Sequence, residues 1–431
     1  MWKFTARHQT TVRWLIAMSL LGVVGVVAFA GSLYYRAAEN DRHVRKWLAT
    51  MDKVLLGELD RSFPRREGFQ SPENLSSAER QLIEHGQEIY NQMLNEHPNH
   101  PELRLKAAMI TRRLGGIYSS IRKFDQAIAH YDRAITLLSE EVNPPIKEFP
   151  RCRALALTYR SLGFALLQTQ EKRRAKSCFE EVERYASQAI KLKPEDAGAY
   201  LYRGFAHLNL KQHDQALRDF TKSAELDGNI EAMRFAGVIH RLRGETEQAL
   251  KWFSNALQKE PGNYRTLYMR AAVYLRRKQY ELAAKDCRAA IGAGVRPIRA
   301  WEYLGTIRRN QGKPQQAVNA LTSALALDPD NGCCLVERGS SKLDMDKVAE
   351  AKADFERAVK LVPDNPFAHN GYGWSLLRSD KAKESIAPFT EAIKLNPRWT
   401  SAYRGRAMAY ERTGEDQKAQ ADREQAKNTP R

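Results

Sequence analysis

Few residues in this sequence combine the types and the spacing that chemistry requires. His97 and His100 could share a metal ion only on a continuous helix, and Pro98 between them breaks such a helix. The Gly-Ala-Gly triplet at 292–294 has the spacing of a phosphate-binding turn, but it follows a segment with helical periodicity rather than a strand. We therefore predict a loop at the histidines and a turn at the glycines, with no metal site.

The cysteines are the other reactive side chains, and their spacing offers no chemistry either. There are five, an odd number, and no CxxC pair occurs, which argues against a disulfide scaffold or a zinc site. The motifs GxxxxGK[ST], HExxH and GxSxG are also missing. We predict a protein without enzymatic activity, cofactor or metal ion. Cys333 and Cys334 open a predicted helix, and we expect one of them to face the core.

The composition is that of a folded, basic chain. The 431 residues are 43% hydrophobic and 28% charged, which suits about three domains or one long repeat array. Lys and Arg number 69 against 51 Asp and Glu, a formal net charge of +18. Such a chain could bind an anionic polymer, either a polysaccharide or a nucleic acid. The basic residues are spread along the sequence without a nucleic-acid-binding motif, so we do not expect nucleic acid as a partner.

An apolar segment near the N-terminus predicts a membrane anchor. A short basic tail, residues 1–13, precedes residues 14–35, which carry no charge and are long enough to span a bilayer as a helix. Trp14 lies at one end and Tyr34 and Tyr35 at the other, where interfacial aromatic residues belong. The alternative is a cleaved signal peptide, because residues 28–30 (Ala-Phe-Ala) resemble a cleavage box. We favour the uncleaved transmembrane helix because the apolar run continues past that box.

The charges that flank this segment are nearly balanced. Three basic residues precede it and four follow it closely, mixed with Glu39 and Asp41. A long C-terminal domain can be translocated despite so small a difference. We predict a single-pass membrane protein with its N-terminus inside and the remainder outside the cytoplasm.

Small residues recur at intervals of 33 or 34 residues from position 197 onward. One column is Ala216, Ala249, Ala283, Ala317, Ala351, Ser385 and Ala419; a second is Ser223, Ala256, Ala290, Ala324, Ala358, Ala392 and Ala426; a third is Gly204, Gly237, Ala271, Gly305, Gly339, Gly373 and Ala407. Phe220, Phe253, Phe355 and Phe389 follow the first column by four residues. Two antiparallel helices that cross closely require small residues at the crossing and large ones in the gaps. We predict helix pairs with a tight turn, often at glycine (Gly244, Gly312, Gly414), that bury their apolar faces only by stacking.

Upstream of position 197 the pattern continues with irregularities. Gly115, Tyr118, Ala127, Tyr131 and Ala134 reproduce one unit, and Leu162, Gly163, Ala175 and Phe179 another. The proline-rich stretch 143–150 breaks the register, and the segment 178–194 is about two turns too long, which predicts an extended helix. A further helix is predicted over 76–97. At the other end Arg423 replaces the phenylalanine of its column, as a terminal, capping unit requires.

These columns resemble the tetratricopeptide repeat family, and the resemblance implies an all-α fold, a right-handed solenoid of helix pairs. The predicted organisation is a tail (1–13), a transmembrane helix (14–35), a juxtamembrane linker (36–72), irregular helices similar to the repeats (73–196) and seven consecutive repeats with a polar cap (197–431). Roughly residues 1–190 also resemble the region behind the kinase domain of some bacterial serine/threonine kinases, in which one span precedes an external repeat array. The kinase itself is missing, since no Gly-rich loop, HRD or DFG occurs.

The family resemblance also implies a binding surface, because the first helix of each repeat lines a concave groove. Candidate partner-binding residues on that face are Tyr202, Phe205, Arg234, Arg265, Tyr268, Arg299, Tyr303, Arg309, Trp374, Arg378, Arg404 and Arg412. Aromatic residues interleaved with arginines suit an extended, acidic peptide. Arg309, Arg378 and Arg412 could instead offset helix dipoles, and the aromatic residues could pack between repeats.

The sequence therefore predicts a membrane-anchored, non-catalytic scaffold that binds a protein or peptide in its groove. One alternative is a sensory or assembly module that works with a separate signalling kinase. A second alternative, from a different class, is a basic solenoid that binds an anionic polymer.

Overall fold

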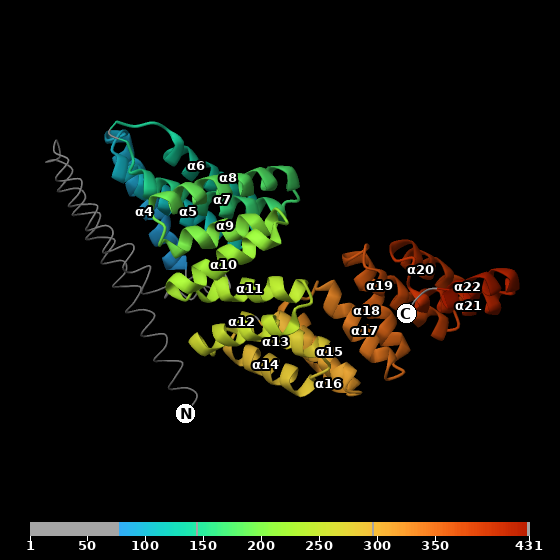
Figure 1. Ribbon diagram of the computed structural model, residues 1–431. Coiled ribbons are helices and arrows are strands. Elements are labelled where there is room, and N and C mark those ends of the chain that lie inside the picture. The colour runs from blue at the N-terminus through green and yellow to red at the C-terminus, as the bar shows by residue number, and fades with distance from the viewer. Residues whose placement is uncertain (1–76, 144, 295–296, 429–431) are drawn as a thin grey trace, which may run out of the picture. The chain divides into compact units, whose positions relative to one another are not determined.

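The computed structural model describes residues 77–143, 145–294 and 297–428, and the regular structure in these ranges is entirely helical (Figure 1). The helices are α4 (Ser77–Glu96), α5 (Pro101–Ser120), α6 (Phe124–Ser139), α7 (Glu148–Gln168), α8 (Lys172–Leu192), α9 (Ala197–Asn209), α10 (His213–Asp227), α11 (Ile230–Leu242), α12 (Thr246–Lys259), α13 (Tyr264–Arg276), α14 (Tyr280–Ala293), α15 (Ile298–Asn310), α16 (Pro314–Leu327), α17 (Gly332–Leu343), α18 (Val348–Leu361), α19 (Pro366–Arg378), α20 (Ala382–Leu395), α21 (Thr400–Thr413) and α22 (Asp416–Asn428).

The predicted membrane span, residues 14–35, and the linker, residues 36–72, lie outside the described residues. Within the part of the chain that the structure does describe, no helix combines the length and the apolar character needed to cross a bilayer. The membrane anchor therefore stays a prediction from the sequence.

The described helices form two compact units that divide within α11, after Ile239. In each unit an odd-numbered helix packs against the even-numbered helix that follows it, as in α7 with α8 or α15 with α16. Successive pairs then pack on one another through contacts such as α8 with α9 and α20 with α21. This is the all-helical solenoid of helix pairs that the repeating columns predict.

The columns of small residues lie where they were predicted, at the crossings of the helices. Phe389 of α20 shows the arrangement, because its ring is fully buried against Gly373 of α19. A Cβ added at Gly373 would lie 2.8 Å from the Phe389 ring, and one at Gly405 of the next pair would overlap the same ring. A larger side chain at either glycine would push the helices apart.

The turn inside each pair places one residue in the left-handed region of backbone conformation. Gly244, Gly312 and Gly414 have φ between 70° and 79° there, as expected for glycine. The turns of other pairs put an ordinary residue in the same conformation, with φ between 57° and 65°. These residues are Arg122, Gln170, Lys211, Lys278, Asp346 and Asp380. The geometry of the turn is thus more constant than its sequence.

An ion pair that the column analysis did not predict joins the two helices of every second pair. Arg203, Arg270, Arg338 and Arg406 each bind the buried aspartate sixteen residues later, namely Asp219, Asp286, Asp354 and Asp422, through two N–H···O bonds of 2.6–2.9 Å. Each of these arginines also donates to a hydroxyl on the preceding even-numbered helix, at Ser187, Ser254, Thr322 or Thr390. Each of these arginines therefore links the two helices of its own pair and also links that pair to the preceding one.

The irregular N-terminal helices agree with the sequence in part. Helix α8 has 21 residues against 14 in α12, which confirms the predicted extension of about two turns. Helices α5 and α7 are also long, with 20 and 21 residues, and this was not predicted. The predicted break at 143–150 is too long, because α7 begins at Glu148 and includes Pro150. A proline fits the first turn of a helix, where its missing N–H is not needed.

The candidate reactive residues have structural roles. The predicted loop at the histidines is confirmed, and Nδ1 of His100 accepts a 3.2 Å hydrogen bond from the Leu103 N–H, which caps α5. Gly292 belongs to α14, which ends at Ala293, so the turn begins later than predicted. Cys334 is buried and Cys333 is exposed, as expected of adjacent cysteines at a helix start. Burial raises the pKa of the Cys334 thiol to about 12, so it is not a reactive thiolate.

Candidate functional site

The odd-numbered helices form what we call the inner face of each unit. They pack against the next odd-numbered helix as well as against their own partner, as in α5–α7–α9 and in α13–α15–α17–α19–α21. Among the described residues, successive even-numbered helices make few contacts of this kind. Each stack therefore curves toward its odd-numbered helices, which are the ones predicted to bind a partner.

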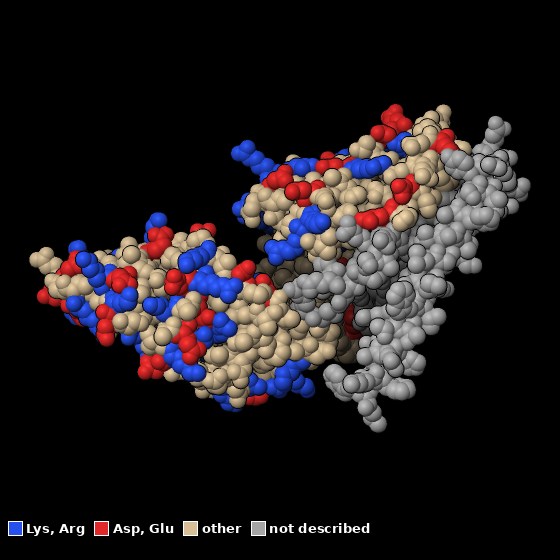
Figure 2. All heavy atoms as spheres, turned by 180° about the vertical axis from the view of Figure 1, so that it is seen from behind, with Lys and Arg blue, Asp and Glu red and all other residues tan. Residues whose placement is uncertain are grey.

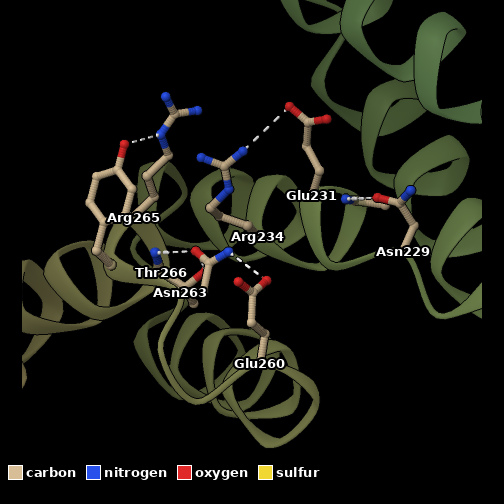
Figure 3. Close-up of polar contacts among 9 residues, drawn as sticks. Asn229, Glu231, Arg234, Glu260, Asn263, Arg265 and Thr266 are labelled. Carbon is tan, nitrogen blue, oxygen red and sulfur yellow. Dashed lines mark hydrogen bonds and ion pairs between the residues drawn. The ribbon is translucent and has the colours of Figure 1, made fainter. Parts of the chain in front are cut away.

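Short polar side chains cap the first turn of several inner-face helices. Asn229 accepts a 2.9 Å hydrogen bond from the Ala232 N–H, and Asn263 accepts one of 3.0 Å from the Thr266 N–H (Figure 3). Asp196 caps α9, and Asn331 caps α17, in the same way. An N-cap side chain satisfies a backbone N–H that the helix leaves open. These caps thus fix where α9, α11, α13 and α17 begin, and so the register in which they present their inner-face residues.

Three of the predicted partner-binding residues are buried in the first unit. Tyr202 and Phe205 of α9 are 8% and 3% exposed, and Phe205 packs edge-on against Phe220 and Phe235. Arg234 of α11 is 5% exposed and forms a 3.4 Å ion pair with Glu231 (Figure 3). These side chains contribute packing, and little of their surface is available to a partner.

Most of the predicted arginines are held by groups of the chain itself. Arg299 binds Glu302 at 2.9 Å, Arg309 binds Asp344 at 2.7 Å, and Arg265 donates to the Tyr264 hydroxyl at 3.1 Å (Figure 3). Arg378 and Arg412 each donate a 3.0 Å hydrogen bond to a backbone carbonyl of the preceding pair, at Leu343 and Leu377 respectively. Arg309, Arg378 and Arg412 thus join consecutive helix pairs, a third role besides the two considered from the sequence.

The remaining candidates present surface on the inner face of the second unit. Tyr268 of α13 and Tyr303 of α15 stack with ring centroids 6.3 Å apart. Trp374 of α19 is half-buried and donates a 3.2 Å hydrogen bond to the Ser401 hydroxyl. Arg404 of α21 is exposed. The second unit thus offers aromatic surface on α13, α15 and α19 rather than a row of free arginines.

Carboxylates that the sequence reading missed balance the charge on this surface. Glu302 lies on α15 beside Tyr303, and Glu337 lies on α17 near Arg309. Burial raises the pKa of Glu337 above its usual value, and the nearby Arg309 opposes that rise. The inner face of the second unit therefore carries both positive and negative side chains.

The first unit differs, because its inner face carries arginines that the sequence reading also missed. Arg112 of α5 and Arg160 of α7 each precede a glycine of the third column, Gly115 or Gly163, by three residues. Arg404 holds the same place before Ala407. Extending the register upstream would have identified both arginines. Arg112 borders a cavity of about 260 Å³ between α5 and α7.

Comparison with known families supports the assignment of the fold. Three family models, each described as a tetratricopeptide repeat, match residues 161–231, 236–296 and 336–398, residues 298–331, and residues 112–144. Together these matches cover more than half of the chain and span both units.

Individual relatives are distant. The human mitochondrial import receptor subunit TOM70 is 22% identical over 60% of this chain and 54% of its own length. A small glutamine-rich tetratricopeptide repeat-containing protein 2 from Saccharomyces cerevisiae is 28% identical over 27% of this chain and 33% of its own. The chain thus spans about half and about a third of these relatives.

Among solved structures, yeast Tom70 aligns with a TM-score of 0.44 at 14% identity, over 95% of this chain and 92% of that one. The family models agree with the helix pairs, the columns of small residues and the inter-pair contacts described above. The chain belongs to the tetratricopeptide repeat family.

Proposed function

We propose that this chain is a non-catalytic scaffold, held at a membrane by residues 14–35, that binds an extended protein segment along its inner faces. The observation that carries the proposal is the aromatic surface of Tyr268, Tyr303 and Trp374 on the odd-numbered helices α13, α15 and α19. Large, rigid aromatic side chains give contact area at a small cost in conformational entropy. The similarity to TOM70, a mitochondrial import receptor subunit, supports a role in protein binding.

Charge distribution favours a protein ligand over an anionic polymer. Lys and Arg are interspersed with Asp and Glu over the described part of the face seen in Figure 2. A polymer binder relies on a continuous basic surface and releases many counterions on binding. The interspersed charges give no such surface on the face shown.

Peptide binding should depend on the inner-face aromatic residues. We expect Trp374→Ala and Tyr303→Ala to weaken the binding of peptides selected on the full chain from a random displayed library, each by at least tenfold. Removing a central aromatic anchor costs about 2 kcal/mol or more. Affinity can be measured by fluorescence anisotropy, with Trp252→Ala on the even-numbered helix α12 as the matched control.

Two results of that titration would contradict the scaffold proposal. One is equal binding by the aromatic variants and the control. The other is a steep salt dependence with no preference for peptide sequence, which would indicate a polymer binder.

Membrane attachment and orientation can be tested in intact cells. We expect protease added outside the cytoplasmic membrane to cut the repeats, while an epitope tag placed before residue 14 stays protected until the membrane is opened. The physical reason is that an uncharged run of this length spans the bilayer once. Protection of the repeats would place them in the cytoplasm, and release of the chain by carbonate extraction would contradict the anchor.

A further inference from the structure

A cavity on the inner face of the first unit lies between α5 and α7. Its volume is about 260 Å³. Apolar side chains form most of its wall, including Leu105, Ala108, Met109 and Leu157. Arg112 and Arg153, together with Asp196 at the start of α9, supply the charged part of the wall. The cavity is open at Met109, whose side chain is 39% exposed.

Two arginines, Arg112 and Arg153, and one carboxylate, that of Asp196, line this cavity. Arg153 pairs with Asp196 at 3.2 Å, and its guanidinium also lies 5.8 Å from the centre of the Tyr202 ring. Arg160 lies over the Tyr202 and Phe205 rings at 5.4 and 4.6 Å. Among the described residues no acceptor reaches the buried Nε of Arg160. Two guanidinium groups thus line the cavity beside one carboxylate, which pairs with Arg153, and Arg160 adds a third positive charge near Arg112.

Arg112 is the least compensated of the three. Burial lowers the pKa of its guanidinium, and the like charges of Arg113 and Arg160 act in the same direction. Tyr202 and Tyr131 oppose this shift, but no carboxylate is among the strongest influences on Arg112. A desolvated cation without a counter-charge raises the free energy of the unbound protein. A carboxylate arriving from outside would relieve that cost.

We propose that this cavity binds an acidic segment of a partner protein, with an apolar side chain in the cavity and a neighbouring carboxylate against Arg112 and Arg160. The inference rests on the proposed scaffold function and assigns the first unit a specific ligand. Arginine suits the role because its guanidinium donates two parallel hydrogen bonds to a carboxylate. The inner face of the second unit, with its own carboxylates, does not share this preference.

The size and lining of the cavity favour a peptide side chain over other ligands. Pockets for small-molecule cofactors usually measure about 300–1,000 Å³ and enclose the ligand, whereas this cavity is smaller and open. A polysaccharide or nucleic acid would present charge without the large apolar group that the wall accommodates. The site therefore requires a large apolar side chain and a carboxylate in one short segment.

Synthetic peptides can test both features together. The probes are ten-residue peptides with one leucine or phenylalanine followed one to three residues later by aspartate, each paired with the same peptide carrying asparagine there. We expect the full chain in detergent to bind some aspartate peptides at least tenfold more tightly than their asparagine partners. A hydrogen bond to a charged group contributes about 1.5–3 kcal/mol, which corresponds to tenfold or more.

Matched variants locate the binding site. Arg112→Gln should abolish the preference for aspartate without lowering the free energy of unfolding, because it removes an unpaired charge. Met109→Trp should fill the open side of the cavity and weaken binding of both peptides in a pair. Arg173→Gln, at an exposed position on the even-numbered helix α8, is the control and should change neither.

The outcomes separate this inference from the proposed function. Peptide binding that is lost in Trp374→Ala but indifferent to Arg112→Gln and Met109→Trp would overturn the cavity as a site while leaving the scaffold. Equal affinity for aspartate and asparagine peptides would also overturn it. Binding of heparin, but of no peptide, would overturn both proposals.

Discussion

Replacing Phe389 by alanine should lower the free energy of unfolding by about 3–5 kcal/mol. The ring is fully buried among Leu377, Ala392 and Ala402, and it meets the edge of Trp374 at a centroid distance of 5.6 Å. The glycines on either side carry no side chains that could move into the space left by the ring. A cavity that cannot collapse places the expected cost in the upper part of the range for such substitutions.

The measurement is urea unfolding followed by circular dichroism, combined with amide hydrogen exchange of α19–α22. Exchange is needed because a repeat array can lose one region while the rest stays folded. Phe367→Ala is the matched control, since Phe367 is 61% exposed on α19 and should cost about 1 kcal/mol or less. Equal effects of the two substitutions would show that the aromatic column does not hold the pairs together.

The second large effect is expected at Asp354, where alanine should cost about 3–5 kcal/mol. Asp354 is 5% exposed and accepts two hydrogen bonds from Arg338 as well as a 2.9 Å ion pair from Lys342. Both cations are largely buried. Removing the carboxylate would leave Arg338, and Lys342 with only its longer 3.6 Å contact to Glu350, as largely buried positive charges, and their desolvation dominates the cost.

An exposed ion pair of the same kind provides the control. Asp330 lies 2.6 Å from Arg357 with both side chains about half exposed or more, so Asp330→Ala should cost about 0–1 kcal/mol. Unfolding in urea at neutral pH measures both variants. An Asp354→Ala protein as stable as the control would mean that Arg338 and Lys342 find water or other partners, and that the buried pair adds no stability.

The sequence predicts the helix pairs well because one physical requirement repeats along it. Large side chains do not fit where two helices cross closely, so alanine and glycine recur at each crossing. The same reasoning finds the extension of α8, since extra residues between two columns can only lengthen a helix or a loop. The same reasoning does not reveal the length of α5 and α7, because their extra turns precede the first small residue of each pair.

The candidate site is harder to predict because position on a helix does not specify a side chain's partners. Arg378 and Arg412 lie at the expected face, yet each is held by a carbonyl 35 residues earlier, a contact that depends on how consecutive pairs stack. Arg112 was not among the predicted residues because its helix lies upstream of the regular columns, where the inner face was not assigned from the sequence. Periodicity identifies which residues share a helix face. Only the packing shows which of them bind other groups of the chain.

The buried Arg–Asp ion pairs occur in every second helix pair. The array can therefore gain or lose two helix pairs, but not one, without placing an unsuitable side chain beside an arginine. Arg338 reaches the hydroxyl of Thr322 on the preceding pair, and loss of α15 and α16 alone would place Arg288 at that position instead. The guanidinium groups of Arg338 and Arg288 would then lie together, where Arg338 now donates a hydrogen bond to the Thr322 hydroxyl. Loss of four consecutive helices would restore a hydroxyl, so duplication or deletion within this lineage is expected to proceed in steps of about 68 residues, twice the repeat length.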